Sequence, residues 1–322
     1  MAQFGWAFIG TGDIARQVAV QIQKEGSCRI AAVWNRTAER AQAFAEEFGT
    51  RAYPTPEEAL AAPGVEGAYV CVNASHHAEY VRRCLAAGVP VLCEKPFTLN
   101  EKDSAALFAM AKERGLYLSE AMWTWHNATA LRVKEKVQSG ALGRIRSVRA
   151  VYAFPLISMQ KYRGRLLSPE AGGGALLDIG VYPVRYVYEL FGAPEEMICR
   201  GSLRGGVDLS DRIRMRYQGF EADIFISISR FGGEKLVIRG EKGSIYVPHF
   251  HEGKGAVMKC GKEKEVFSDD SLLYGKQFAQ VAAEIRAGKK ESAFIPAAGT
   301  LAVMRLLDAC RAQLGLRYPA EE

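Results

Sequence analysis

The residues with the clearest chemical potential lie at the end of a short apolar run. Val91-Leu92-Cys93 is typical of a buried strand of a parallel sheet, and Glu94, Lys95 and Pro96 follow it directly. Proline has no N–H to donate to a neighbouring strand, so the strand is expected to stop there. Lys95 is therefore predicted to stand at the carboxyl end of a strand, the edge where open α/β sheets bind ligands. A solvated lysine in a loop is the alternative.

A carboxylate and a phenol form a second pair. Asp178 and Tyr182 follow the glycine run Gly172–Gly174, whose backbone can approach a ligand closely. The helix expected from there to about Phe191 places both side chains on one face, at i and i+4. The carboxylate can orient the phenol or bind substrate hydroxyls, and Lys95, if close, would lower the pKa of Tyr182 toward working pH. These residues indicate a site for proton transfer. The alternative is a structural role, with Asp178 at the start of a helix and Tyr182 in the core.

The start of the chain predicts an element that binds a dinucleotide. A β-rich run, Phe4–Ile9, leads into a G-x-G-x-x-A motif made of Gly10, Thr11, Gly12, Asp13, Ile14 and Ala15. Gly10 permits the tight turn, and Gly12 lets the backbone approach a pyrophosphate. The helix predicted over Ile14–Glu25 directs its free N–H groups at that phosphate. We expect residues 10–14 to bind a dinucleotide; a purely structural glycine turn is the alternative.

The end of the second strand predicts which dinucleotide is bound. NAD sites usually carry Asp or Glu about 20 residues after the glycines, where it bonds the ribose hydroxyls. Here Asn35 and Arg36 follow the strand Ile30–Trp34. A carboxylate would repel a 2′-phosphate, whereas a guanidinium can bind it with two hydrogen bonds. Arg40, one helical turn on, could assist, so NADP is favoured over NAD. The alternative is that Arg36 stacks on the adenine or faces water.

Strand and helix patterns alternate through the first third of the chain. This alternation predicts an α/β Rossmann domain, with a doubly wound parallel sheet, over residues 1–121. Asn73 follows the buried strand Gly67–Val72 and is expected to hydrogen-bond the cofactor from the same sheet edge. Glu94 and His77 are also assigned to the cofactor site. For His77, capping or local packing is the open alternative.

The remainder, residues 122–322, is predicted to form an α+β domain that binds substrate and dimerises. Short β-rich segments separated by glycine-containing turns run from Glu195 to Val247, and two helices follow them. Such a meander forms an open, mainly antiparallel sheet with helices on one face. The free face is a natural surface for a homodimer. Gly164–Ser168 is expected to be a loop.

Composition restricts the class of protein. The chain has 322 residues, 48% of them hydrophobic, and a net charge of +6 without a long basic run, which argues against a nucleic-acid partner. No apolar run reaches about 18 residues, so no transmembrane helix is expected. The seven cysteines lack CxxC spacing and suit reduced thiols in a cytoplasmic protein. The close histidine pairs, His76-His77 and His249-x-His251, lack a helical spacing with a carboxylate, so no metal is expected.

These motifs together resemble the Gfo/Idh/MocA family of NAD(P)-dependent oxidoreductases, over essentially the whole chain. The marks of the resemblance are Gly10-x-Gly12-x-x-Ala15, Glu94-Lys95-Pro96, Glu120-Ala121-Met122-Trp123-Thr124 and Asp178-Ile179-Gly180-Val181-Tyr182. The last two are most similar to the branch that holds the dimeric dihydrodiol dehydrogenases and glucose–fructose oxidoreductases.

The resemblance implies a fold and a reaction. The fold is a Rossmann domain followed by a domain with an open sheet, usually dimeric through that sheet. The reaction is hydride transfer between nicotinamide and a carbon bearing a hydroxyl or carbonyl group of a sugar, cyclic diol or related small molecule. By analogy, Tyr182 exchanges the proton with the substrate oxygen, Lys95 holds the nicotinamide ribose and tunes Tyr182, and Asp178 orients the substrate or Tyr182.

Two other functions occur on this fold. A non-enzymatic NAD(P)-binding regulator would be expected to lack the lysine or the tyrosine, and both are present. An NAD-dependent glycosidase is disfavoured by the neutral Asn35. The substrate itself is not predicted, because specificity depends on loops at Pro155–Ser168 and Val247–Gly255.

Overall fold

The computed structural model describes residues 2–321, which form two compact units. Unit 1 contains the chain up to His126 together with Ser271–Leu301. Unit 2 contains Asn127–Asp270 and the chain from Ala302 onward. Each unit is built on its own sheet, of five strands in unit 1 and eight in unit 2.

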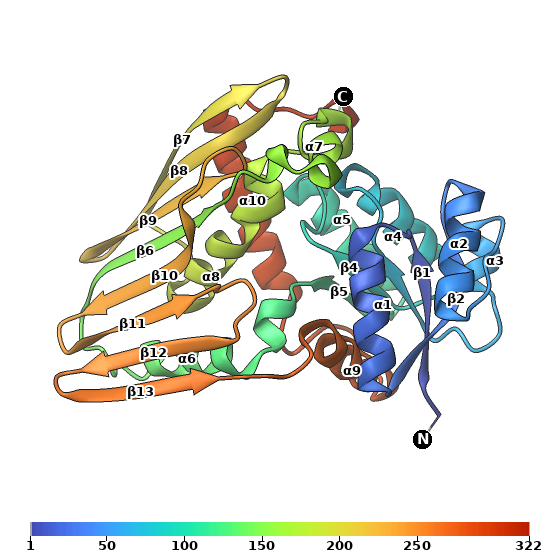
Figure 1. Cartoon of the computed structure of the whole chain (residues 1–322), viewed down its shortest axis with the longest axis horizontal. Coiled ribbons are helices and arrows are strands. Elements are labelled where there is room, and N and C mark those ends of the chain that lie inside the picture. The colour runs from blue at the N-terminus through green and yellow to red at the C-terminus, as the bar shows by residue number, and fades with distance from the viewer. Residues whose placement is uncertain (1, 322) are drawn as a thin grey trace. The chain divides into compact units, whose positions relative to one another are not determined.

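The sheet of unit 1 is parallel, with the order β2-β1-β3-β4-β5 (Figure 1). Its strands are β1 (Phe4–Ile9), β2 (Cys28–Trp34), β3 (Gly67–Val70), β4 (Val91–Glu94) and β5 (Leu118–Ala121). Most of their residues are buried, as expected for strands covered on both faces. The strand order reverses between β1 and β3, and in such sheets ligands bind at the carboxyl ends next to that point. The predicted doubly wound sheet is confirmed.

Helices cover both faces of this sheet. On one face lie α1 (Asp13–Glu25), α2 (Ala38–Phe48) and α9 (Leu273–Arg286). On the other face lie α3 (Pro56–Leu60), α4 (His77–Ala86) and α5 (Glu101–Glu113). The first face has an aromatic core in which Phe278 of α9 meets Trp6, Phe8 and Tyr69, with ring centroids 5.0, 6.2 and 4.9 Å away.

Helix α9 changes the division of the chain. All residues after 121 were predicted to form a second domain, whereas Ser271–Leu301 belongs to unit 1. The reason is burial, because Phe278, Val281 and Ala282 complete the core on the α1 face of the sheet. Unit 1 is therefore made of two segments that are far apart in sequence.

The sheet of unit 2 has the order β13-β12-β11-β10-β6-β9-β8-β7. Its strands are β6 (Ile145–Ala153), β7 (Glu196–Arg204), β8 (Val207–Tyr217), β9 (Phe220–Ser227), β10 (Gly233–Gly240), β11 (Gly243–Pro248), β12 (Gly255–Cys260) and β13 (Glu263–Ser268). Among the described residues β6 and β9 pair in parallel, and the other neighbours are antiparallel. The predicted open, mainly antiparallel sheet is confirmed.

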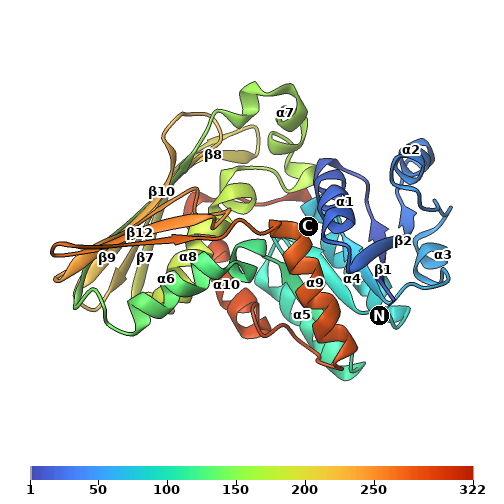
Figure 2. The ribbon, with the colours of Figure 1, turned by 60° about the horizontal axis from the view of Figure 1, so that its bottom comes forward.

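Helices pack on one face of this second sheet. Figure 2 shows α6 (Ala128–Gln138), α8 (Val181–Phe191) and α10 (Ala297–Leu314) on the same side of the strands. The opposite face carries exposed side chains, among them Tyr246 and Val266, which are 43% and 63% exposed. No described helix of unit 2 covers that face.

Three segments of unit 2 differ from the sequence prediction. Most of the predicted loop Gly164–Ser168 is helical, because α7 (Gln160–Leu166) extends into it. Strands β12 and β13 were not predicted; β13 is a polar edge strand, and charged residues at an edge weaken the apolar alternation that marks a strand. Leu176–Gly180 is π-helical, so Asp178 and Tyr182 do not share one regular α-helix. Pro183 has no N–H for the carbonyl four residues earlier, which suits this wider turn.

The glycine run packs against the protein itself, which corrects the prediction of close approach to a ligand. A Cβ on Gly173 would lie 2.6 Å from the carbonyl oxygen of Leu166. Gly174 has φ +107°, and a Cβ there would lie 2.1 Å from Oδ1 of Asp208. The hydroxyl of Tyr318 donates to the carbonyl oxygen of Gly173 at 2.7 Å. The glycines are therefore required by internal packing just before the segment that carries Asp178.

A buried pair of carboxyl groups holds the start of that segment. Asp208 and Asp211 on β8 are 0% and 1% exposed, and they hydrogen-bond to each other. Oδ2 of Asp208 also accepts the backbone N–H of Leu176 at 2.6 Å. Burial, followed by the charge of Asp208, raises the pKa of Asp211 to about 10. The pair therefore shares a proton at neutral pH, with Asp211 as the donor.

None of the helices within residues 2–321 has the length and apolar character needed to cross a bilayer. In the same part of the chain no group of three or more His, Cys, Asp or Glu side chains is placed to hold a metal ion. The seven cysteines are free thiols. The cytoplasmic location stays a prediction.

The acid pair predicts how stability depends on pH. Folded Asp211 keeps its proton up to about pH 10, whereas an unfolded aspartate loses it near pH 4. The folded state thus binds more protons between these values, and the free energy of unfolding falls as pH rises, by at most about 1.4 kcal/mol per pH unit. In Asp211→Asn the amide still donates a hydrogen bond to Asp208, but it does not titrate. The free energy of unfolding of this variant, relative to that of the wild type, should therefore increase from pH 5 to pH 9.

Urea unfolding of both proteins across this pH range measures the difference. Asp270→Asn, at an exposed aspartate of the same unit, is the control and should follow the wild type. A difference between Asp211→Asn and the wild type that stays constant with pH would contradict the shared proton.

Candidate functional site

The turn after β1 has the shape that the G-x-G-x-x-A motif predicts. Gly10 has φ +123°, a conformation that other residues rarely adopt. A Cβ on it would lie 2.7 Å from the carbonyl oxygen of Cys71, just after β3. Glycine is therefore needed for the turn from β1 to pass this close to the loop after β3, at the point where the strand order reverses.

The second glycine leaves room for a ligand. A Cβ built on Gly12 would meet no heavy atom within 4 Å, and Gly12 and Asp13 are exposed. Gly12 is also the N-cap of α1, and no side chain caps that helix start. The first N–H groups of α1, from Asp13 and Ile14, thus stand beside open space. This combination of free N–H donors, a helix dipole and missing side-chain bulk fits the pyrophosphate of a dinucleotide.

Asn35 is used to join two loops of this region. Its Nδ2 donates to Oγ1 of Thr11 at 2.7 Å, and its Oδ1 accepts the backbone N–H of Thr37 at 2.8 Å. The side chain of Thr11 is 6% exposed, so its contribution to a ligand site is made by the backbone. Arg36 and Arg40 follow and are exposed. The end of β2 therefore presents guanidinium groups where an NAD site would carry a carboxylate.

Glu94 positions the backbone of Lys95. Its Oε1 accepts the hydroxyl of Tyr69 at 2.6 Å, and its Oε2 accepts the backbone N–H of Lys95 at 3.2 Å. Burial raises the pKa of Glu94 to about 7, against the hydrogen bond from Tyr69 and the charge of Lys95. Glu94 is 8% exposed, so the structure gives it a positioning role in place of the predicted cofactor contact. Lys95 is partly exposed at the carboxyl end of β4, as predicted.

His77 is a correction, whereas Asn73 remains open to a ligand. His77 is 1% exposed, and its ring nitrogens lie 2.9 Å from the carbonyl oxygen of Pro96 and 3.1 Å from that of Val72. Burial lowers its pKa to about 4, so the ring is neutral. The neutral ring can donate to only one of these carbonyl groups, but both of its nitrogens face the backbone of the loops after β3 and β4, so His77 packs internally. Asn73 is exposed just after β3.

In unit 2 the structure pairs Asp178 with a residue of α7. Nη1 of Arg165 lies 2.9 Å from Oδ1 of Asp178, whose side chain is 10% exposed, against 41% for Arg165. This charge-assisted hydrogen bond holds the carboxylate of Asp178 against α7.

Tyr182 lies in a cluster of rings. It is 7% exposed, and its ring centroid lies 6.2 Å from Tyr152 of β6 and 5.4 Å from His251 in the loop after β11. His251 and Tyr152 are 5.0 Å apart. Nδ1 of His251 lies 2.7 Å from Oε1 of Glu234 on β10. The phenol is thus packed beside a histidine that a buried carboxylate orients.

The sequence analysis missed Glu234 and considered His251 only as a metal ligand. A signal for Glu234 was present in strand alternation, because it is in phase with Leu236 and Ile238, which are 0% exposed. A carboxylate at a core position of a strand needs buried hydrogen-bond partners. His249 and His251 are the histidines nearest to Glu234 in the sequence and could have been considered as those partners.

Two models of one family match the chain. The one described as an oxidoreductase family with an NAD-binding Rossmann fold matches residues 4–122. The one described as the GFO/IDH/MocA C-terminal domain matches residues 130–246. Together they cover more than half of the sequence, in the order that the two sheets follow.

Similar proteins match over nearly their full length. The trans-1,2-dihydrobenzene-1,2-diol dehydrogenase of Mus musculus is 28% identical, covering 98% of this chain and 98% of its own. The scyllo-inositol 2-dehydrogenase (NADP(+)) IolU of Bacillus subtilis is also 28% identical, covering 98% and 99%. The solved structure of KijD10, a 3-ketoreductase of Actinomadura kijaniata in complex with NADP and TDP-benzene, aligns with a TM-score of 0.87 and 26% identity, over 97% of this chain and 98% of that one.

The family models, the relatives and the two sheets agree with the resemblance found in the motifs. This chain belongs to the Gfo/Idh/MocA family of oxidoreductases.

Proposed function

We propose that this chain is an NADP-dependent oxidoreductase that acts on the hydroxyl or carbonyl group of a sugar, cyclic diol or related small molecule. The observation that carries the proposal is the turn after β1, which leaves open space beside Gly12 at the uncapped start of α1. Relatives support the reaction class, since two are named as dehydrogenases of a diol and an inositol and a third is named as a 3-ketoreductase.

The choice of NADP rests on the end of β2. Asn35 carries no charge and is occupied by Thr11 and Thr37, so no carboxylate repels a 2′-phosphate there. The exposed guanidinium of Arg36 can bind that phosphate, and Arg40 adds a second positive charge. NADP appears in the printed names of IolU and of the KijD10 complex. Asn73 is proposed to hydrogen-bond the cofactor from the loop after β3.

The reaction needs a proton to move as the hydride moves. When bound, the nicotinamide supplies or accepts the hydride. Tyr182 is proposed to exchange the proton with the substrate oxygen, and Lys95 to hold the nicotinamide ribose and to favour the ionised phenol by its charge. Asp178 is proposed to orient the substrate or Tyr182, and its pairing with Arg165 holds the carboxylate in place. Support for these roles comes from the residue types and the resemblance of the motifs.

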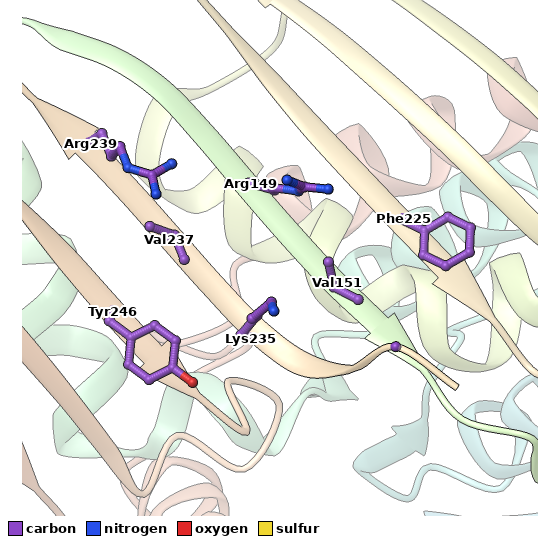
Figure 3. Close-up of a pocket in the computed structure, with 8 residues that line it drawn as sticks. Arg149, Val151, Phe225, Lys235, Val237, Arg239 and Tyr246 are labelled. Carbon is purple, nitrogen blue, oxygen red and sulfur yellow. The ribbon is translucent and has the colours of Figure 1, made fainter. Parts of the chain in front are cut away.

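We further propose that a second copy of the chain covers the open face of the unit 2 sheet. A hollow of about 500 Å³ lies on this face. Figure 3 shows the side chains of β6, β9, β10 and β11 that line it. The lining residues are Arg149, Val151, Phe225, Gly232, Lys235, Val237, Arg239 and Tyr246.

Area and charge both suit self-association. Eight strands about 4.8 Å apart and about 20 Å long present roughly 800 Å², the area that each partner contributes to a standard stable interface. The face carries both signs of charge, since Arg149 stands directly across from Asp223 in the β6–β9 register. A two-fold axis brings each such patch onto the same patch of the other copy.

The cofactor assignment is tested by thermal-shift titration with NADP(H) and NAD(H). A ligand that binds the folded state raises stability by RT ln(1 + [L]/Kd), so the midpoints rank the affinities. NADP(H) should act at lower concentration than NAD(H). Arg36→Ala should weaken NADP(H) binding about tenfold or more, the value of a charge-assisted hydrogen bond, and leave NAD(H) unchanged.

Arg51→Ala, at another exposed arginine of unit 1, is the matched control. Equal affinity for the two cofactors, or an equal loss for both in Arg36→Ala, would refute the 2′-phosphate assignment. If neither cofactor shifts the transition, the enzymatic function itself is contradicted.

The proton-transfer role is tested by Tyr182→Phe. The variant keeps the ring packing with Tyr152 and His251 but lacks the hydroxyl, so kcat should fall about 10²- to 10⁴-fold while NADP(H) binding is unchanged. Steady-state kinetics and the thermal-shift titration measure the two effects. Tyr188→Phe, in the same helix α8, should retain wild-type turnover. Retained turnover in Tyr182→Phe would remove Tyr182 from proton transfer.

The dimer is tested by sedimentation velocity. The wild type should sediment with twice the chain mass of 35.4 kDa. Val237→Glu places a charge between Arg149 and Tyr246 in the hollow and should shift the protein to monomer. Val20→Glu, at a 41% exposed position of α1, should leave the mass unchanged. A monomeric wild type would rule out this interface.

A further inference from the structure

A cluster of positive side chains surrounds one residue of the open sheet face in unit 2. Lys235 and Arg239 lie two positions before and two positions after Val237 on β10, and Arg149 stands directly across from Val237 on β6. Residues two apart on a strand, and residues directly paired across strands, point to the same face of a sheet. The three cations are exposed, and all of them line the hollow drawn in Figure 3.

The protein does not balance this charge locally. Within residues 2–321, no carboxylate forms an ion pair with Arg149, Lys235 or Arg239, and the hollow is lined there by neither Asp nor Glu. Asp223 stands across from Arg149, but its two oxygens accept from Arg212 at 2.7 and 2.8 Å. The hollow is therefore a site of uncompensated positive charge on a sheet whose other arginines include paired ones.

The spacing of the cations suits an anion with more than one charged group. At about 3.3 Å per residue, the backbone positions of Lys235 and Arg239 are about 13 Å apart along β10. Long side chains close part of this distance, so two linked phosphate groups can contact both ends while Arg149 meets them from β6. Tyr246 stands directly across from Val237 on the other side, on β11, and its hydroxyl can donate a further hydrogen bond to an oxyanion.

The proposed dimer increases the need for such an anion. A second copy that covers this face removes the three cations from water, and buried charges are costly unless opposite charges accompany them. On the β7–β9 part of the face, Asp223 is paired with Arg212, and Glu196 is paired with Arg216 at 3.0 Å. These carboxylates of a second copy are thus already engaged, so an added anion is the better source of negative charge.

We propose that the hollow around Val237 binds an anion with two linked phosphate groups, held by Arg149, Lys235 and Arg239, and that the bound anion tightens the pairing of two copies. The effect on pairing rests on the proposed dimer, whereas binding of the anion does not. Because binding and pairing are linked, an anion that favours the paired state lowers the dissociation constant of the dimer. The site belongs to unit 2, whereas the proposed cofactor-binding residues belong to unit 1.

Calorimetric titration of the full chain with inorganic pyrophosphate tests the site. Saturating NADPH fills the cofactor site, and chloride keeps the ionic strength constant so that general screening does not change. Lys235→Gln and Arg239→Gln each remove one charge-assisted hydrogen bond at an exposed position, so each should weaken pyrophosphate binding about tenfold or more. Arg214→Gln, at an exposed arginine of β8 in the same sheet, is the matched control and should bind as the wild type does.

Sedimentation velocity over a dilution series tests the effect on pairing. Pyrophosphate should lower the dissociation constant of the wild-type dimer about tenfold or more, relative to chloride at the same ionic strength. This gain should be lost in Lys235→Gln and Arg239→Gln and kept in Arg214→Gln. Val237→Glu places a carboxylate where the anion would lie, so pyrophosphate should not restore its dimer.

The outcomes separate the site from the dimer and from the enzyme. Equal pyrophosphate binding in the wild type, Lys235→Gln and Arg239→Gln would indicate an adventitious ion only and overturn the site. Binding at the site with an unchanged or raised dissociation constant overturns the effect on pairing and leaves the dimer standing. A wild type that is monomeric with and without pyrophosphate contradicts the proposed dimer, and the effect on pairing falls with it. The oxidoreductase function is tested separately by the cofactor titration.

Discussion

Buried carboxyl groups are the constraint on which the candidate functional segments depend. A carboxyl group inside a protein must find hydrogen-bond donors or hold a proton. Three times in this structure the donor is a backbone N–H of a segment that contains or contacts a candidate site residue. Glu94 accepts from Lys95, Asp208 accepts from Leu176 two residues before Asp178, and Glu234 accepts from His251. The positions of these three segments therefore follow from the need of the buried carboxyl groups for hydrogen-bond donors.

The three groups meet this need by different chemistry. Asp208 shares a proton with Asp211, so the pair carries one charge less than two carboxylates would. Glu94 binds a phenol and lies beside the charge of Lys95, yet burial still raises its pKa to about 7. Glu234 uses a histidine ring and a backbone N–H from one loop. In each unit, a neutral or compensated core group thus holds a segment that contains a candidate site residue. Such a group costs less than an isolated buried charge.

How far the sequence predicted this protein depends on how local each feature is. The glycine turn after β1, the apolar strands and Lys95 at the end of β4 follow from short patterns, and the structure has them where expected. The role of α9 did not follow, because Phe278 completes a core whose members outside α9 lie about 150 or more residues earlier. The internal packing of His77 and of the glycine run did not follow, because it depends on the carbonyl group of Pro96 and the side chain of Asp208, which come from other segments. Glu234 stood in a core phase of its strand, and alternation could have identified it.

The return of α9 to unit 1 has a consequence for synthesis on the ribosome. The strands of the first sheet are complete once residue 121 is made, but Phe278 is added only after every strand of unit 2. At about 5–20 residues per second this interval lasts roughly 10–30 s. During that time Trp6, Phe8 and Tyr69 lack the aromatic partner that covers them in the finished protein. An unfinished chain thus presents an apolar surface for a chaperone, and that surface is covered only after the last strand of the second sheet has been made.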